Sequence, residues 1–464
     1  MAMKTTQTSA GPATRREFLK KTATAAAAVA VSPLFQRTVY GQAPSAGKVI
    51  GANDRITVGF IGVGGQGMNA HVRIMKPNTQ ANNVAQVAVC DVWQKRVGAA
   101  KEFIEKDNAG AKVETFGDYR KLLEQKDIDA VVISTHDPIH APAIIAAMES
   151  GKHVYCEKPL TRYLGEAFAV QDVVKKTGKV LQVGSQGCSA QAWHKAAEMI
   201  QGGKIGQLVW AQGYYCRNSP KGEWNYPMDP DAKPENLDWE KWLGQVKKRG
   251  PFDPQHYFRW RKFYPYCAGL LGDLMPHRLH PLMLAMGKPE FPSRVVAIGT
   301  KTVHPDKKQT DGTPERDVPE HIELLAEFPS GVSLMLACST INAKSPGFVL
   351  YGHHASLEIG TSGERIELKP EKEFAEEIDP ETFDGLKPTE DIGAHHKNWI
   401  DCIRTNKQPN CGIDLALRVQ TVISLAEMSD RLKIACLFDE KTRKVTTADG
   451  KEVAPITYGS TELS

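Results

Sequence analysis

Lys158 stands where a side chain could meet a bound ligand, because it directly follows a short apolar run that ends at Glu157. The run predicts a strand over His153–Cys156, and Pro159 fixes the chain as it leaves that strand. In open α/β sheets, ligands bind outside the carboxyl ends of the strands. We therefore expect Lys158 to line a site. The alternative, a surface lysine in a turn, fits the apolar run less well.

A second candidate pair is Asp273 and His277, spaced i and i+4 in the chain. On a helix this spacing directs both side chains from one face into one pocket. An imidazole whose pKa lies near neutrality can accept the proton of an alcohol. Pro276 directly precedes the histidine and either distorts the helix or marks its start. A buried structural histidine is the alternative interpretation.

A glycine-rich turn follows the predicted strand Ile56–Ile61. The residues of this turn that we expect to contact a dinucleotide are Gly62, Gly64, Gly65, Gln66 and Gly67. The glycines permit a tight turn, a close approach of the backbone to a pyrophosphate, and close packing of helix on strand. Asp91 ends the next strand, where a carboxylate accepts from ribose hydroxyls and repels a 2′-phosphate. NAD is therefore favoured over NADP, although Lys95 and Arg96 soften this preference; a merely structural turn is the alternative.

Short apolar strands alternate with helices in the first part of the chain, which indicates parallel pairing with right-handed crossovers. These strands are predicted at Ile56–Ile61, Val84–Cys90, Ala130–Ser134, His153–Cys156 and Val180–Gly184. Residues 217–265 are rich in Pro, Trp, Tyr and Arg, and predict a long ordered loop that covers a site. Strand-like segments from residue 294 to residue 360 have no helix between them, as in an antiparallel sheet.

The length of 464 residues exceeds that of one ordinary core, so we expect two domains. We place the first at residues 54–178 and the second at 179–440, followed by a tail at 441–464. The net charge of +4 and the lack of a dense basic stripe argue against nucleic acid as a partner. The nine cysteines form an odd set without zinc-ligand spacing, so we expect neither a metal site nor a disulfide scaffold.

Residues 1–41 have the pattern of a twin-arginine export signal. Arg15 and Arg16 precede a mildly apolar, alanine-rich run from Ala23 to Val31. A short amphipathic helix is the alternative. No later segment reaches the roughly 18 apolar residues of a membrane span. We therefore expect a periplasmic or secreted protein that is exported folded.

Taken together, these features resemble the glucose–fructose oxidoreductase, inositol dehydrogenase and MocA family (Gfo/Idh/MocA). The resemblance covers nearly all of the mature chain. It depends on four segments in this order: residues 130–135 with His140, residues 151–159, residues 182–186, and residues 272–277. It implies an α/β fold class with an N-terminal Rossmann doubly wound parallel sheet. It also implies a C-terminal α+β domain whose open, mainly antiparallel sheet makes a homo-oligomer, a dimer or tetramer.

The resemblance also implies roles for individual residues. Lys158 is expected beside the nicotinamide ribose, where it holds the substrate hydroxyl and stabilises alkoxide charge. His277 is expected to accept the hydroxyl proton, and Asp273 to bind substrate or orient the site. The other residues expected to contact cofactor are Thr135, His140 and Glu157. His136-Asp137 replaces the commoner Pro-Asn of the family, and the role of His280 stays open.

Residues 257–261 carry the stacking faces and guanidinium donors that sugar sites use. The residues expected to bind substrate are Tyr257, Arg259, Arg261 and His280. Packing of an ordered loop over the sheet is the equally open alternative for residues 257–261.

The sequence thus predicts an NAD-dependent oxidoreductase that acts on a hydroxyl of a sugar, glycoside or polyol. Because an exported enzyme cannot easily exchange its cofactor, we expect bound NAD to be regenerated within each catalytic cycle. A redox-neutral glycoside hydrolase, lyase or epimerase that works through a transient keto-sugar is the first alternative. A sugar-binding Rossmann protein without turnover is the second.

Overall fold

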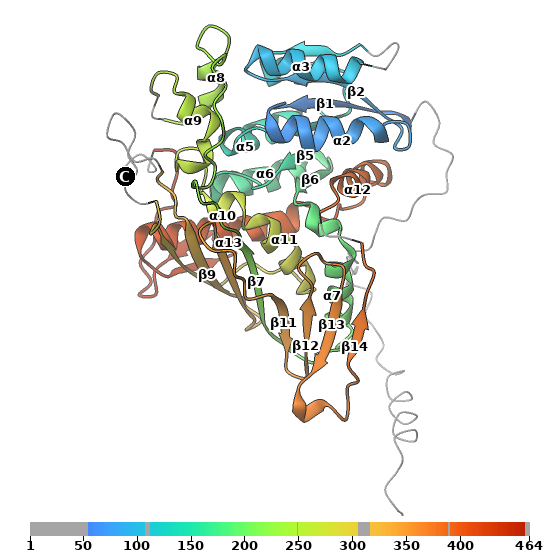
Figure 1. The fold of residues 1–464 in the computed structure, drawn as a ribbon, viewed down its shortest axis with the longest axis vertical. Helices are drawn as coiled ribbons and strands as arrows, with labels where there is room; N and C mark the ends of the chain where they lie inside the picture. Colours follow the sequence, from blue (N-terminus) through green and yellow to red (C-terminus); the bar gives the residue numbers. More distant parts are fainter. Residues whose placement is uncertain (1–53, 107–111, 248, 305–315, 388–389, 460–464) are drawn as a thin grey trace, which may run out of the picture. The chain divides into compact units, whose positions relative to one another are not determined.

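The computed structural model describes residues 54–106, 112–247, 249–304, 316–387 and 390–459. All of them belong to one compact unit, Gln42–Ser464. The expected export signal at residues 1–41 lies outside the described residues. The described part contains a six-stranded and a ten-stranded sheet (Figure 1).

The six-stranded sheet is parallel throughout, as the alternation of strands and helices predicts. Its order is β3-β2-β1-β4-β5-β6. The strands are β1 (Ile56–Ile61), β2 (Val84–Cys90), β3 (Glu114–Phe116), β4 (Ala130–Ile133), β5 (His153–Glu157) and β6 (Leu181–Gly184). The order reverses between β1 and β4, and such a switch point opens a crevice at the carboxyl edge. The doubly wound Rossmann topology is therefore confirmed.

Helices connect these strands and cover the faces of the sheet. They are η2 (Gly67–Val72), α2 (Arg73–Met75), η3 (Lys76–Asn78), α3 (Gln94–Glu105), α4 (Tyr119–Leu123), η4 (Asp137–Ile139), α5 (His140–Glu149) and α6 (Leu164–Thr177). Val58, Phe60 and Val132 form a buried core with Trp399 and Ile400, which come from much later in the chain. The last helices therefore complete the core of the first sheet.

The ten-stranded sheet is antiparallel except where β7 pairs with β10 in parallel. Its order is β14-β13-β12-β11-β7-β10-β9-β8-β15-β16. The strands are β7 (Leu208–Cys216), β8 (Arg294–Thr300), β9 (His321–Glu327), β10 (Ser333–Ser339), β11 (Phe348–Gly352), β12 (Ala355–Ile359), β13 (Ile366–Pro370), β14 (Glu381–Phe383), β15 (Cys436–Asp439) and β16 (Lys444–Thr446). Burial alternates along β8 and β9, so one face of this sheet is packed and the other is exposed. The open, mainly antiparallel sheet is confirmed.

The second half also carries ten helical segments. They are η5 (Gln186–Ser189), α7 (Gln191–Gln201), α8 (Trp239–Leu243), α9 (Pro254–Phe258), η6 (Trp260–Lys262), α10 (Leu270–Asp273), α11 (Pro276–Ala285), η7 (Lys372–Phe374), α12 (Ile392–Thr405) and α13 (Ile413–Leu432). Asp273 and His277 do not share one helix, because α10 ends at Asp273 and α11 begins at Pro276. The cause is Pro276, which has no N–H to donate and is suited to a first helical position.

The described residues of the segment 217–265 include three short helices, α8, α9 and η6. They are attached to the edge of the six-stranded sheet, where Trp93 and Leu237 form a β-bridge (Figure 1). Beside this bridge, the amide of Asp238 donates to the carbonyl of Val92 at 3.0 Å. The segment therefore closes over the loop that follows β2.

Described residues of the expected tail, 441–459, contact the rest of the fold. β16 pairs with β15 in the larger sheet, and the buried Tyr458 donates its hydroxyl to Glu166 at 2.9 Å. All nine cysteines are described and none forms a disulfide. Among the described residues, no helix has both the length and the apolar character needed to cross a bilayer.

Candidate functional site

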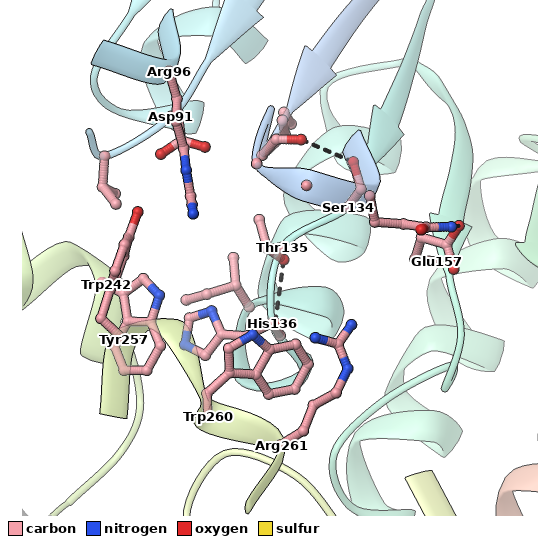
Figure 2. Close-up of a pocket in the computed structure, with 18 of the residues that line it drawn as sticks. Asp91, Arg96, Ser134, Thr135, His136, Glu157, Trp242, Tyr257, Trp260 and Arg261 are labelled. Atoms are coloured by element: carbon pink, nitrogen blue, oxygen red, sulfur yellow. Dashed lines mark hydrogen bonds between the residues drawn. The ribbon is translucent and has the colours of Figure 1, made fainter. Parts of the chain in front are cut away.

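A cavity of about 1100 Å³ lies at the carboxyl edge of the six-stranded sheet. Its walls come mainly from the ends of β1, β2, β4 and β5, the residues after β3, the segment 217–265 and the α10–α11 turn. Figure 2 shows Asp91 and Arg96 on one side of this cavity and Glu157 on the other, with aromatic rings of the segment facing the strands. The cavity occupies the switch point where such sheets bind ligands.

The glycine turn has the shape that a dinucleotide needs. Gly62 adopts φ +84°, and a Cβ there would lie 2.8 Å from the carbonyl oxygen of Ser134. A Cβ on Gly67 would collide with the carbonyl of Gly62, so η2 packs directly on the turn. Gly65 faces open space. Backbone N–H groups at such a turn can approach a pyrophosphate closely, so these residues fit NAD.

Asp91 ends β2, and its carboxylate is held by two backbone donors. Oδ2 accepts from the amide of Val63 and Oδ1 from the amide of Trp93, both at 3.0 Å. These bonds fix the carboxylate beside the glycine turn, and free lone pairs on both oxygens still face the cavity. This is the arrangement that accepts ribose hydroxyls.

Arg96 is a cavity residue that the sequence analysis treated only as a modifier of specificity. A Cβ on Gly64 would lie 2.9 Å from its guanidinium, and the guanidinium carbon is 4.9 Å from the ring centre of Tyr257. Tyr257 therefore lies beside Asp91 and Arg96, at the end of the cavity expected for adenosine. Tyr257 lines the cavity at this end, and its contact with substrate stays a prediction.

The loop after β4 is held in place by stacking and by His140. His136 stacks on Trp242 with ring centres 4.1 Å apart and planes 2° apart. His140 is buried behind the cavity wall, where its Nδ1 lies 2.8 Å from the carbonyl of Pro159 and its Nε2 lies 3.2 Å from that of Thr135. His140 therefore ties the Thr135 loop to Lys158-Pro159 and does not itself line the cavity.

Lys158 points into the cavity from the end of β5. Its Nζ donates to the side-chain Oδ1 and to the backbone carbonyl of Asp273, each at 2.7 Å. Arg261 Nε also donates to Oδ1 at 2.8 Å, and Trp224 Nε1 donates to Oδ2 at 2.8 Å. Burial would raise the pKa of Asp273, but Arg261 and Lys158 hold it well below its usual range. Asp273 is thus an ionised carboxylate that orients two cations.

His277 lines the same end of the cavity as Lys158 and Asp273. Burial, followed by the nearby charge of Lys158, lowers the pKa of its imidazole to about 3. The ring is therefore neutral at pH 7 and able to accept a proton. The two helices of the α10–α11 turn bring Asp273 and His277 to one cavity even though they do not share a helical face.

Other residues that we expected to contact ligand lie behind the cavity wall. Gly67 packs inside the turn. Arg259 donates to the carbonyl of Tyr226 at 2.9 Å and to Gln255 at 2.8 Å, and does not line the cavity. His280 is buried, with its Nδ1 2.9 Å from the carbonyl of Pro276. The expectation that Arg259 and His280 contact substrate directly is therefore corrected, because both side chains have structural positions. Arg261 does line the cavity.

Cavity residues that the sequence analysis missed come mostly from the larger sheet and its loops. They are Tyr215, Arg217, Tyr226, Trp242, Trp260 and Glu390, together with Gln186. Trp242 and Trp260 lie in the segment expected to cover a site, and their aromatic character was the available signal. The described residues contain no cluster of three or more His, Cys, Asp or Glu side chains arranged to hold a metal ion.

A parallel sheet with a glycine turn at its switch point, joined to an open mixed sheet, defines the class of two-domain NAD-binding oxidoreductases. Two models of one family match the chain. The NAD-binding Rossmann fold of the oxidoreductase family matches residues 56–185, and its C-terminal alpha/beta domain matches residues 244–433. The chain belongs to this Gfo/Idh/MocA oxidoreductase family.

Curated relatives match over part of their length. A glycosyl hydrolase family 109 protein of Shewanella pealeana is 30% identical over 211 residues, which is 43% of this chain and 45% of the relative. The inositol 2-dehydrogenase of Salmonella typhimurium is 30% identical over 174 residues, which is 37% of this chain and 49% of the relative. The matched region thus spans about half the length of these relatives.

Solved structures show the same fold at low identity. A levoglucosan dehydrogenase in complex with NADH and levoglucosan superposes with a TM-score of 0.62 and 19% identity, covering 82% of this chain and 98% of that one. An oxidoreductase domain protein from Kribbella flavida gives a TM-score of 0.64 and 20% identity, covering 83% of this chain and all of that one.

Proposed function

We propose that this protein is an NAD-dependent oxidoreductase that acts on a hydroxyl-bearing carbon of a sugar, glycoside or polyol. The observation that carries the proposal is the meeting of Lys158, Asp273 and a neutral His277 in one cavity with the glycine turn. NAD, when bound, accepts or returns a hydride at the reacting carbon. The chain must supply the rest: binding, orientation and movement of the hydroxyl proton.

In this proposal the Nε2 or Nδ1 lone pair of His277 takes the hydroxyl proton as the carbon is oxidised. The ammonium of Lys158 donates to the same oxygen and stabilises its developing negative charge. Asp273 keeps the ammonium ionised and aimed, because it accepts from Nζ at 2.7 Å. Such general acid–base assistance contributes about 10²- to 10⁴-fold to a rate.

NAD is proposed in preference to NADP because the Asp91 carboxylate lies where a 2′-phosphate would stand. Arg96 acts against this preference, because its guanidinium lies beside Gly64 within the same cavity. Binding of the two cofactors to the same preparation distinguishes them.

A neutral, hydroxyl-rich substrate is supported by the balanced charges at the Lys158 end. Arg217 pairs with Glu223 through two bonds of 2.9 and 2.7 Å, and Arg278 pairs with Glu390 at 3.1 Å. Paired ions offer both donors and acceptors to hydroxyl groups, and Tyr226 adds an aromatic face. Relatives named as an inositol dehydrogenase, a levoglucosan dehydrogenase and a glycosyl hydrolase agree with this substrate class.

We further propose export by the twin-arginine route into the periplasm or beyond, with NAD retained and recycled in place. Attachment of segment 217–265 to the edge of the Rossmann sheet supports retention, because the segment covers the cavity at its Asp91 end. One substrate oxidised and a second reduced is the favoured scheme. Redox-neutral cleavage or epimerisation through a keto-sugar is the second candidate, and the family 109 relative favours it.

A homo-oligomer, a dimer or tetramer, is proposed from the exposed face of the ten-stranded sheet. Val209, Val296, Ile298 and Leu325 are exposed there, and Ile298 exposes 66% of its surface. Apolar side chains gathered on one sheet face are typical of a protein–protein contact. The molar mass in solution tests this proposal.

The function is tested by incubating the purified protein with a panel of glycosides and free sugars, without added cofactor. Keto-sugar formation, paired oxidation and reduction, or bond cleavage each identify one scheme. In parallel, the supernatant of denatured protein from the periplasm is assayed for NAD(H), and about stoichiometric nucleotide is expected. A binding protein without turnover would yield no product from any sugar and would contradict the proposal.

A further inference from the structure

We propose that Glu157 makes the cavity select the oxidised, positively charged nicotinamide over the neutral reduced form, and that His71 is the positioning residue that holds Glu157 for this task. The inference rests on the proposed function, because it takes NAD as the ligand of the cavity. It assigns a role to a carboxylate and a buried histidine pair that the proton movements described above do not use.

Glu157 lies at the end of the cavity where the nicotinamide half of the cofactor is expected. Asp91, at the end of β2, marks the adenosine half. The rest of a dinucleotide must then extend across the glycine turn toward β4 and β5, and Glu157 is the last residue of β5. Figure 2 shows Glu157 on the side of the cavity away from Asp91.

The Glu157 carboxylate is ionised. Its Oε1 accepts from His71 Nε2 at 2.9 Å and from Gln66 Nε2 at 3.2 Å, and its Oε2 accepts from the Lys158 amide at 3.3 Å. Burial would raise the pKa of Glu157, but hydrogen bonding to His71, the electrostatic effect of His71 and the charge of Lys158 lower it to about 2. The cavity wall therefore carries a negative charge at this point.

No lysine or arginine side chain among the described residues forms an ion pair with that charge. The Lys158 ammonium is turned away to Asp273, which Arg261 also neutralises. Within hydrogen-bond reach, Glu157 has amides and an imidazole as donors. A buried charge without a counter-ion is costly, and a ligand that brings the opposite charge removes that cost.

The buried histidine pair holds the Glu157 carboxylate in place through a chain of two contacts. His71 Nδ1 lies 2.9 Å from His396 Nε2, and the buried Nδ1 of His396 has no hydrogen-bond partner among the described residues. Burial holds the pKa of His396 well below its ordinary value, so its ring carries one hydrogen. A buried N–H group without an acceptor is rarer than a buried acceptor without a donor. The unpartnered Nδ1 of His396 is therefore taken as the acceptor, and the hydrogen is placed on Nε2. Donation then runs from His396 to His71 and on to Glu157.

The local helix geometry delivers His71 to this place. Residues Gly67–Val72 form a π-helical turn, and His71 within it is completely buried. Wider turns of this kind are uncommon and frequently occur at functional sites. Three elements are therefore linked at Glu157. His396 of α12 contacts His71 of the π-helical turn, and His71 contacts Glu157 at the end of β5.

A site that binds the oxidised form more tightly lowers the reduction potential of the bound couple. For a two-electron couple, each tenfold in the ratio of the two dissociation constants corresponds to about 30 mV. The oxidised form is then the resting state, ready to take hydrogen from the first substrate.

The test compares binding of NAD⁺ and NADH to the full chain, stripped of resident nucleotide, by calorimetry. Glu157→Gln keeps the size of the side chain and removes its charge. We expect Kd for NAD⁺ to rise about tenfold or more, with Kd for NADH changed less than about threefold. His71→Phe, which removes the donor, is expected to shift the ratio in the same direction. His71→Gln, whose amide can replace the Nε2 donor, is expected to restore it.

Glu149→Gln is the matched control, because Glu149 is exposed on α5 and pairs with Lys176; its ratio of Kd values should equal that of the parent protein. Equal weakening of both nucleotides in Glu157→Gln would overturn the inference while turnover on sugars still supported the proposed function. Failure of the parent protein to bind either nucleotide would overturn both. Circular dichroism identifies a variant that does not fold, and if His71→Phe is one, Glu157→Gln and His71→Gln decide the question.

Discussion

The Lys158 ammonium donates both to the carboxylate and to the backbone carbonyl of Asp273, each at 2.7 Å. Lys158 directly follows β5 and Asp273 ends α10, so the pair joins the edge of the parallel sheet to the helices that pack on the larger sheet. Two bonds to one partner fix the direction of the lysine side chain. In the proposed reaction, the substrate hydroxyl would therefore meet a donor that is already held in position.

Replacing Lys158 with Met should lower turnover about 10²- to 10⁴-fold, because the oxygen of the substrate loses its charged donor. The fold should survive, since Asp273 keeps its bonds from Arg261 and Trp224. The measurement is kcat on the substrate identified from the sugar panel, with circular dichroism for the fold. Lys176→Met on the surface of α6 is the control and should turn over normally. Normal turnover in Lys158→Met would assign the cavity to binding alone.

Replacing Asp273 with Asn should destabilise the protein by about 3–5 kcal/mol, because it leaves Lys158 and Arg261 buried without their counter-ion. The urea midpoint at pH 7 reports the loss. Asp229→Asn serves as control, since Asp229 forms an exposed pair with Lys95 that solvent screens, and its replacement should leave the urea midpoint nearly unchanged. A loss for Asp273→Asn as small as that of the control would contradict the buried ion-pair network.

The acid limb of the profile of kcat/KM against pH should fall below pH 5 and not near 6.5. Burial and Lys158 lower the pKa of His277 to about 3, so the ring still accepts a proton in mildly acidic solution. Rates on the chosen sugar between pH 4 and pH 8 locate the limb. His277→Asn should lose most turnover across this range. An inflection near 6.5 in the parent protein would mean that the free imidazole titrates as an exposed one does.

The same depressed pKa links His277 to stability. Between pH 6.5 and about 3 the unfolded chain binds a proton on this ring that the folded protein does not, so stability falls as the pH falls. From pH 7 to pH 5 the contribution is less than about 2 kcal/mol. His277→Asn should therefore lose less stability than the parent over this interval, as measured by urea unfolding at both pH values. Equal losses of stability in the parent and in His277→Asn between pH 7 and pH 5 would contradict the lowered pKa of His277.

Replacing Tyr257 with Phe should weaken NAD binding about three- to tenfold, because one neutral hydrogen bond is worth about 0.5–1.5 kcal/mol. The buried Tyr257 hydroxyl has no hydrogen-bond partner among the described residues and lies near Asp91. Stability without nucleotide should be unchanged or slightly higher, since an unsatisfied hydroxyl is removed. Tyr351→Phe in β11 is the control for both measurements. Unchanged NAD affinity would place the hydroxyl outside the cofactor site.

Features of the site that depend on local sequence could be predicted. The glycine turn, Asp91 at the end of β2 and Lys158 at the end of β5 each follow from a short apolar run and the residues beside it. The split between α10 and α11 was also within reach, because Pro276 signals a first helical position.

Features that depend on contacts between distant segments could not. His140, Arg259 and His280 have side chains typical of ligand sites, yet their polar atoms are turned to carbonyls of the fold itself. Conversely, His71 was not singled out, since its partner His396 lies 325 residues further along the chain. Residue type indicates which chemistry is possible, whereas long-range packing decides which atoms are free to perform it.

The bridge between Trp93 and Leu237 is a short piece of β-structure that joins the loop after β2 to the segment beside the cavity. Widening the cavity at that end requires its backbone bonds, such as that from Asp238 to Val92, to break together. The rate at which a nucleotide dissociates would then depend more on the opening of this loop than on the contacts that the nucleotide itself makes. Hydrogen exchange at the Asp238 amide measures directly how often these backbone bonds open.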